Sequence, residues 1–178
     1  KIDPTAPEVR TGSIASNNSD NTTAKAGEAV TLSFTTSEPV RTPAASDVTL
    51  GSLTGVTITQ QDDEGKSWKA VGTVPASADG NAAFSITVLD NAGNRGSPKT
   101  TTTDGTSVTL DTMTPTLSNL VLASPNAKDS TRLAKADDDL TLTFTSSEKI
   151  TAPTITLAGS SATVTDTSGG AQTSWRVT

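Results

Sequence analysis

The stretch "AVTLSFTTSEPV", residues 29–40, decides the fold class of this chain. In it the apolar residues Val30, Leu32 and Phe34 alternate with Thr and Ser, which is the period of a β-strand with one buried face. The stretch nearly recurs as "DLTLTFTSSEKI", residues 139–150, and both copies reach Ser-Glu after the strand. A strand that recurs and is followed by the same residues predicts two copies of one β-rich module.

Matches on either side of this strand extend the repeat. "DPTAPEV" from Asp3 matches "DTMTPTL" from Asp111, so the copies lie about 108 residues apart. We therefore predict module 1 over residues 1–110 and module 2 over residues 111–178. Module 2 aligns with module 1 only as far as Val71, so we expect it to be C-terminally incomplete. Either it is a shortened stretch, or a partner chain supplies the strands that it lacks.

Several further segments of module 1 have the alternation of strands and are separated by turn-rich segments such as "DDEG" and "ASADGN". Six or seven short strands in about 100 residues are typical of an antiparallel sandwich. The predicted fold class is all-β, with tandem immunoglobulin-like Greek-key β-sandwiches. The expected strands besides residues 30–35 cover residues 9–14, 56–59, 68–73, 84–88 and 108–110.

The composition excludes several classes of function. The 178 residues carry a net charge of -6, which disfavours nucleic acid and anionic membrane surfaces as partners, because both are bound by clustered Lys and Arg. There is no cysteine, so neither a disulfide nor a thiolate metal site is available. No apolar run is long enough for membrane insertion. Without histidine, cysteine or a nucleophile motif, no enzyme and no catalytic residue is predicted.

Acidic residues mark one end of the predicted sandwich. In the immunoglobulin-type topology, the loop after the second strand and the loop before the last strand lie at the pole where the chain enters. In module 1 these segments carry Glu38, then Asp90 and Asn91, and Asp3. Calcium takes about six to eight oxygen ligands from carboxylates, amides and carbonyls. These four residues are therefore predicted as a calcium site.

Module 2 repeats half of this ligand set, as Asp111 and Glu148. A cation bound by this pair would lie at the junction of the modules and stiffen the connection. The same loops also fit a purely structural explanation, in which Glu38 accepts hydrogen bonds from its own loop and "DNAGN" forms turns around Asp90. Both explanations stay open at this point.

The segments "TLSFTTSEPV", "SDVTLGS" and "SWKAVGTVPASADGNAAFSITVLDNAGN" resemble the bacterial Ig-like domain repeats of giant cell-surface and secreted adhesins. The resemblance implies an extracellular stalk at the bacterial cell surface, which spaces an adhesive domain away from the cell and binds calcium. It implies two kinds of partner: neighbouring Ig-like repeats of the same chain, and a protein or glycan receptor of the full-length protein. The alternative is an adhesive binding module that contacts a host or neighbouring cell through loops or strand edges.

Overall fold

The computed structural model describes residues 3–178, which divide into two compact units. The first unit ends at Met113, and the second runs from Thr114 to Thr178. The predicted boundary after residue 110 lies just before this division. Residues 3–178 form strands and turns without a helix, which confirms the all-β class. Accordingly, no helix among them is long and apolar enough to span a bilayer.

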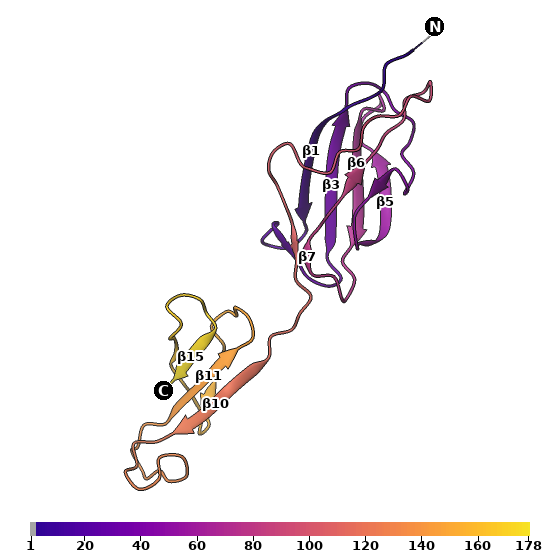
Figure 1. Ribbon diagram of the computed structural model, residues 1–178. Coiled ribbons are helices and arrows are strands. Elements are labelled where there is room, and N and C mark those ends of the chain that lie inside the picture. The colour runs from indigo at the N-terminus through magenta and orange to yellow at the C-terminus, as the bar shows by residue number, and fades with distance from the viewer. Residues whose placement is uncertain (1–2) are drawn as a thin grey trace. The chain divides into compact units, whose positions relative to one another are not determined.

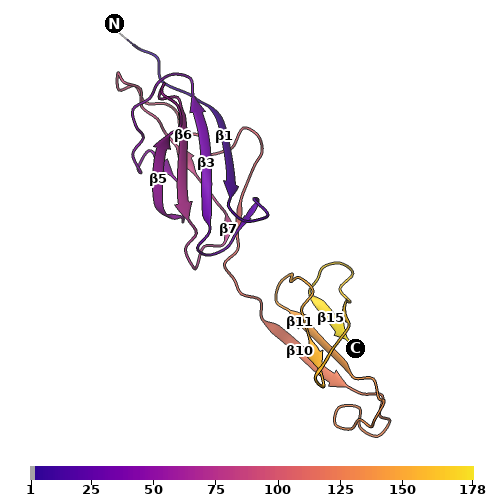
Figure 2. The same ribbon diagram turned by 180° about the vertical axis from the view of Figure 1, so that it is seen from behind.

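Strands of the first unit form one four-stranded sheet and two smaller ones. They are β1 (Val9–Ser16), β2 (Thr23–Ala24), β3 (Ala29–Thr36), β4 (Val48–Thr49), β5 (Thr54–Gln60), β6 (Ser67–Thr73), β7 (Gly80–Asn81), β8 (Ser85–Ile86) and β9 (Thr109–Leu110). The large sheet is antiparallel with the order β1-β3-β6-β5, seen from both sides in Figures 1 and 2. The smaller sheets have the orders β2-β9-β7 and β4-β8.

The inner face of the large sheet carries the core of the first unit. Val30, Leu32 and Phe34 of β3 are buried between more exposed Thr and Ser, as their alternation predicts. Trp68 and Ala70 of β6 are buried beside them. Each large apolar side chain contributes about 1.5–3 kcal/mol when it is fully buried. The rest of this core comes from the large sheet, the smaller sheets and the loops between them, namely Ile14, Ala24, Val40, Val48, Leu50, Leu53, Val74, Ala78, Phe84, Ile86, Val88, Val108 and Leu110.

Two predicted strands differ in detail from the structure. The segment 84–88 keeps its buried residues, but only Ser85–Ile86 forms a strand, because its pairing with the following chain is reduced to single bridges such as Ile86↔Lys99. Val56 and Ile58 are only half-buried, because β5 is the edge strand of its sheet. The Greek-key immunoglobulin topology stays a prediction.

The second unit repeats the large sheet. Its strands are β10 (Leu117–Ala123), β11 (Thr141–Ser146), β12 (Thr156–Leu157), β13 (Ser160–Ser161), β14 (Val164–Asp166) and β15 (Ser174–Val177). The order β10-β11-β15-β14 corresponds to β1-β3-β6-β5, and the pair Phe144↔Trp175 corresponds to Phe34↔Trp68. Phe144, Trp175 and Val177 form its buried core. Trp68 and Trp175 are therefore both core residues of their units.

The turn before the tryptophan strand differs between the units. In the first unit, Gly65 has φ +73° and its carbonyl accepts a hydrogen bond from Trp68 Nε1 at 3.2 Å. In the second unit, Gln172 takes the equivalent position with φ +56°, and the buried Trp175 Nε1 finds no partner among the described residues. A residue with a Cβ is strained in this left-handed conformation. The second unit thus holds local strain that the first avoids.

Replacing this residue with glycine tests the strain. We expect Gln172→Gly to stabilise the second unit by about 0.5–1 kcal/mol, since relief of the left-handed strain exceeds the entropy cost of glycine. Urea unfolding followed through the amide NMR signals of β11 measures the change. The reverse substitution, Gly65→Gln, is the matched control and should destabilise the first unit by a similar amount. An unchanged midpoint for β11 would contradict the prediction.

Candidate metal centre

The chain leaves β3 through Thr36, Ser37 and Glu38, and hydrogen bonds fix this exit. Thr36 Oγ1 donates to the Glu38 carbonyl at 2.7 Å. Ser37 binds the segment before β1 twice: its N–H donates to the Glu8 carbonyl at 2.9 Å, and its Oγ accepts the Glu8 N–H at 2.9 Å. The serine therefore joins the strand exit to the entering chain, and Glu38 follows it at that pole.

The second unit makes the same bonds at the second Ser-Glu. Ser146 Oγ donates to the Glu148 carbonyl at 2.6 Å. Ser147 N–H donates to the Thr116 carbonyl at 2.9 Å, and Thr116 N–H donates to Ser147 Oγ at 3.0 Å. The recurrence of Ser-Glu in the sequence thus has a local cause in each unit. The serine holds the entering chain, and the glutamate beside it is brought to the same end.

A tight turn after Val88 brings a third carboxylate to this pole. Asp90 is 2% exposed, and a bridge pairs it with Val40 just beyond Glu38. Its Oδ1 accepts the N–H groups of Gly93 at 2.6 Å and of Asn94 at 2.8 Å. Asp90 is therefore held rigidly by the loop "DNAGN".

Asn94 is the functional residue that the sequence analysis did not assign. Its Nδ2 lies 2.7 Å from Asp90 Oδ2, 2.8 Å from the Asp3 carbonyl and 3.1 Å from the Thr5 carbonyl. One amide group thus orients the buried aspartate and fixes the chain that carries Asp3. The spacing of an Asn four residues after a predicted ligand, with a Gly between them, is the signal that could have identified it.

Asp3, Glu38 and Asp90 come together at this pole. Each offers a carboxylate oxygen, and the three oxygens lie within 4.8 Å of one another. Among residues 3–178, none of the Lys and Arg side chains forms an ion pair with any of these carboxylates. Carboxylate oxygens are the preferred ligands of hard cations. The cluster can therefore hold a metal ion.

The group of three carboxylates does not include the other predicted ligands. Asn91 is exposed, and its carbonyl accepts a hydrogen bond from Arg41 Nη2 at 3.0 Å. Asp111 accepts the Met113 N–H at 3.2 Å, as Asp3 accepts the Thr5 N–H at 3.2 Å. Asp111 belongs to the first unit and Glu148 to the second. Their predicted pairing stays a prediction.

Opposing effects set the pKa of Asp90. Burial raises the pKa of this carboxyl, but the side chain of Asn94 and the N–H groups of Asn94, Gly93 and Ala92 donate hydrogen bonds to it. These bonds favour the charged form, so the pKa of Asp90 lies below its ordinary value. The carboxylate is therefore ionised at neutral pH and available to a cation.

The lowered pKa predicts that acid destabilises the first unit. The folded pKa of Asp90 lies below the unfolded value of about 3.9, so the ionised carboxylate stabilises the fold above that pH. This stabilisation is lost as the pH falls from about 3.9 through the folded pKa. We expect Asp90→Asn to lower the urea midpoint at pH 7 in chelator and to flatten its decline below about pH 4. The exposed Asp63→Asn is the control, and an equal decline in both variants would contradict the prediction.

No protein-family model, curated protein or solved structure matches this chain. The features that bear on function are therefore the repeat, the two units and the carboxylate cluster. Of these, the cluster is the feature with a definite chemistry, because its three carboxylate oxygens lie within 4.8 Å of one another.

Proposed function

We propose that this chain is a pair of immunoglobulin-like modules that form part of the stalk of an extracellular bacterial adhesin. In this proposal Asp3, Glu38 and Asp90 bind calcium in the first module. The observation that carries the proposal is the group of three carboxylate oxygens within 4.8 Å of one another, one of them from a buried residue, without an ion pair in the described chain.

The strand order supports the immunoglobulin-like part of the proposal. The order β1-β3-β6-β5 corresponds to the A-B-E-D sheet of that fold. The pairing of β4 with β8, followed by the bridge Ile86↔Lys99, corresponds to the C, F and G strands of the opposite sheet. A small sandwich that recurs along the chain suits a stalk, because repeated modules extend it without a new fold.

Charge repulsion supports a cation in the cluster. Carboxylates whose oxygens lie this close disfavour one another's charged forms, and proteins relieve such repulsion by protonation or by a cation. Protonation of Asp90 is opposed by the hydrogen bonds from Asn94 and Gly93 that favour its charged form. Calcium suits the site better than magnesium, because its coordination tolerates irregular geometry and carbonyl ligands.

The repeat extends the proposal to the second module. Asp111 and Glu148 are the counterparts of Asp3 and Glu38, and the segment from Asp111 to Thr116 is as long as that from Asp3 to Glu8. Both segments begin with the same aspartate turn and are bound by the same serine. Calcium on Asp111 and Glu148 would shorten the free part of the connection and stiffen the stalk.

Calcium titration tests the proposal. Isothermal titration of the chelator-treated chain should detect calcium binding, and the thermal midpoint of the first unit should rise with calcium, because the ion binds only the folded state. Glu38→Gln should abolish the rise. Glu64→Gln is the matched control: it removes the same charge from an exposed loop position and should leave the rise intact. Equal midpoints in calcium and chelator would refute the metal site.

Solution scattering tests the stiffening separately. The distribution of intramolecular distances in the whole chain should narrow on calcium addition and stay broad in Glu148→Gln. Binding without any change in this distribution would retain the calcium site of the first module and remove the stiffened connection from the proposal.

A further inference from the structure

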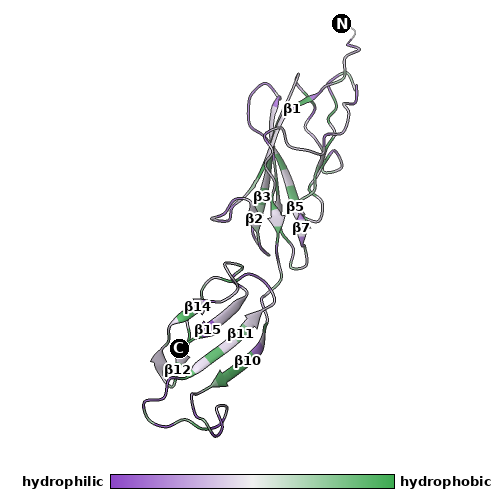
Figure 3. Cartoon of the chain, turned by 60° about the vertical axis from the view of Figure 1, so that its left-hand side comes forward, coloured by the Kyte–Doolittle hydropathy of each residue, from purple (hydrophilic) through white to green (hydrophobic). Residues whose placement is uncertain are grey.

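The second unit exposes residues whose counterparts in the first unit are core residues. Leu122 pairs with Leu142 as Ile14 pairs with Leu32, yet Leu122 is 48% exposed and Ile14 only 3%. The nearby counterparts of the buried residues Ala24 and Val30 are also more exposed to solvent: Ala134 is exposed and Leu140 is half-buried. In Figure 3 the C-terminal part of β10 is coloured as strongly hydrophobic.

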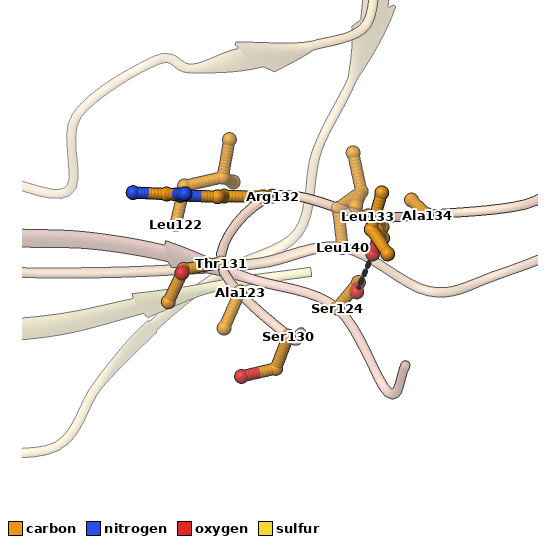
Figure 4. A pocket seen from close by; sticks show the side chains of 9 residues that line it. All are labelled: Leu122, Ala123, Ser124, Ser130, Thr131, Arg132, Leu133, Ala134 and Leu140. Carbon is orange, nitrogen blue, oxygen red and sulfur yellow. Dashed lines mark hydrogen bonds between the residues drawn. The ribbon is translucent and has the colours of Figure 1, made fainter. Parts of the chain in front are cut away.

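These more exposed positions line a pocket. It has a volume of about 200 Å³ and is formed by the end of β10 and the segment from Ser124 to Leu140. Figure 4 shows its side chains, among them Leu122, Leu133 and Leu140. A hydrogen bond from Ser124 Oγ to the Leu133 carbonyl fixes the loop across it. The exposed Arg132 also lines it, with its Nε 3.9 Å from Asp129 Oδ2.

The first unit shows what covers the same positions there. β9 pairs with β2 in parallel, with Leu110 beside Ala24, and Val108 and Leu110 are both buried in the core. The chain just before β9 also binds the outer edge of β1: Thr103 N–H donates to the Gly12 carbonyl at 2.8 Å, and Ile14 N–H donates to Thr106 Oγ1 at 2.9 Å. One segment thus closes both the apolar positions and the strand edge.

We propose that the β10 side of the second unit is an acceptor for a strand-forming polypeptide segment with the chemistry of residues 103–110. The segment would seat two alternating aliphatic side chains in the pocket, as Val108 and Leu110 cover Ala24 and Ile14, and would bind the edge of β10 through backbone and threonine groups. An acidic residue at its end, like Asp111 after β9, would complement Arg132 at the pocket. This inference goes beyond the proposed stalk function and does not depend on calcium.

A synthetic peptide of residues 100–112 tests the proposal on the whole chain. Titrated into the isotope-labelled chain, it should shift the amide NMR signals of β10 and of the loop 124–140 and leave those of β1 unchanged, because β1 is already covered. A peptide with Leu110→Asp should bind at least about tenfold more weakly. The absence of shifts in β10 up to about 1 mM peptide would overturn the proposal, since it sets the affinity below the millimolar range.

Two neighbouring substitutions locate the site. Leu122→Glu places a charge in the pocket, and Val121→Glu places the same charge on the opposite face of the same strand, where Val121 is 49% exposed. We expect Leu122→Glu to weaken peptide binding at least about tenfold and Val121→Glu to leave it unchanged. Equal weakening by both would refute the pocket as the acceptor. Sedimentation that shows a dimer of the free chain, dissociated by Leu122→Glu, would assign the surface to a second copy and refute the strand segment.

Discussion

Replacing Trp68 with alanine should lower the free energy of unfolding of the first unit by about 3–5 kcal/mol. The side chain is 1% exposed, pairs across the sheet with Phe34 and donates its Nε1–H to the Gly65 carbonyl at 3.2 Å. The truncation therefore leaves a cavity in the middle of the core and a carbonyl with one partner fewer. A loss of this size is a large part of the stability of a domain of about 100 residues.

Urea unfolding followed through the amide NMR signals of β3 measures this loss. Trp175→Ala is the internal control: it should destabilise the second unit, with the signals of β3 unchanged. Its cost should be smaller than that of Trp68→Ala, because Trp175 Nε1 has no hydrogen bond in the described chain to lose. A loss of less than about 1 kcal/mol on Trp68→Ala would show that the core relaxes around the cavity far more than close packing allows.

Replacing Asn94 with alanine should weaken calcium binding about 10–100-fold, which is typical when a residue that orients a metal ligand is removed. Asn94 Nδ2 binds Asp90 Oδ2 at 2.7 Å and the Asp3 backbone carbonyl at 2.8 Å, so the substitution removes one contact from each of two ligand residues. Isothermal titration gives the affinity, and the unfolding midpoint in chelator shows that the variant is folded.

Asn91→Ala separates orientation of ligands from ligation in the same loop. The substitution keeps the carbonyl that accepts the bond from Arg41, so calcium affinity should stay at the wild-type value. Weakening by Asn91→Ala equal to that by Asn94→Ala would identify the Asn91 side chain as a ligand, as the sequence predicts. Unchanged affinity in Asn94→Ala would show that the entering chain is held in place without this amide.

The alternation of apolar residues predicted the parts of the fold that are buried on one face. It located β3 and β6 because their inward residues are buried by a regular sheet. The alternation predicted too long a strand around Ile86. The apolar residues there are buried, but most of the segment does not pair with a neighbouring strand. The alternation could not foresee the exposure of Leu122, whose apolar side chain has the pattern of a core residue.

The carboxylate cluster followed from topology more than from any local motif. Asp3, Glu38 and Asp90 are far apart in sequence, and their meeting was predicted from where the loops of a sandwich lie. The distances depend on contacts that the residue pattern does not encode, such as the reach of Asn94 to two carbonyls of the entering chain. The contact of Arg41 Nη2 with the Asn91 carbonyl at 3.0 Å is likewise not encoded in the residue pattern.

The parallel pairing of β2 with β9 has a mechanical consequence for a chain under tension. Thr109 N–H donates to the Thr22 carbonyl at 2.8 Å, and Asp111 N–H donates to the Ala24 carbonyl at 2.9 Å. A pull on the chain beyond Asp111 acts along β9, and therefore across these bonds at the same time. Under this load the hydrogen bonds between β2 and β9 would have to break together in shear and could not break one after another.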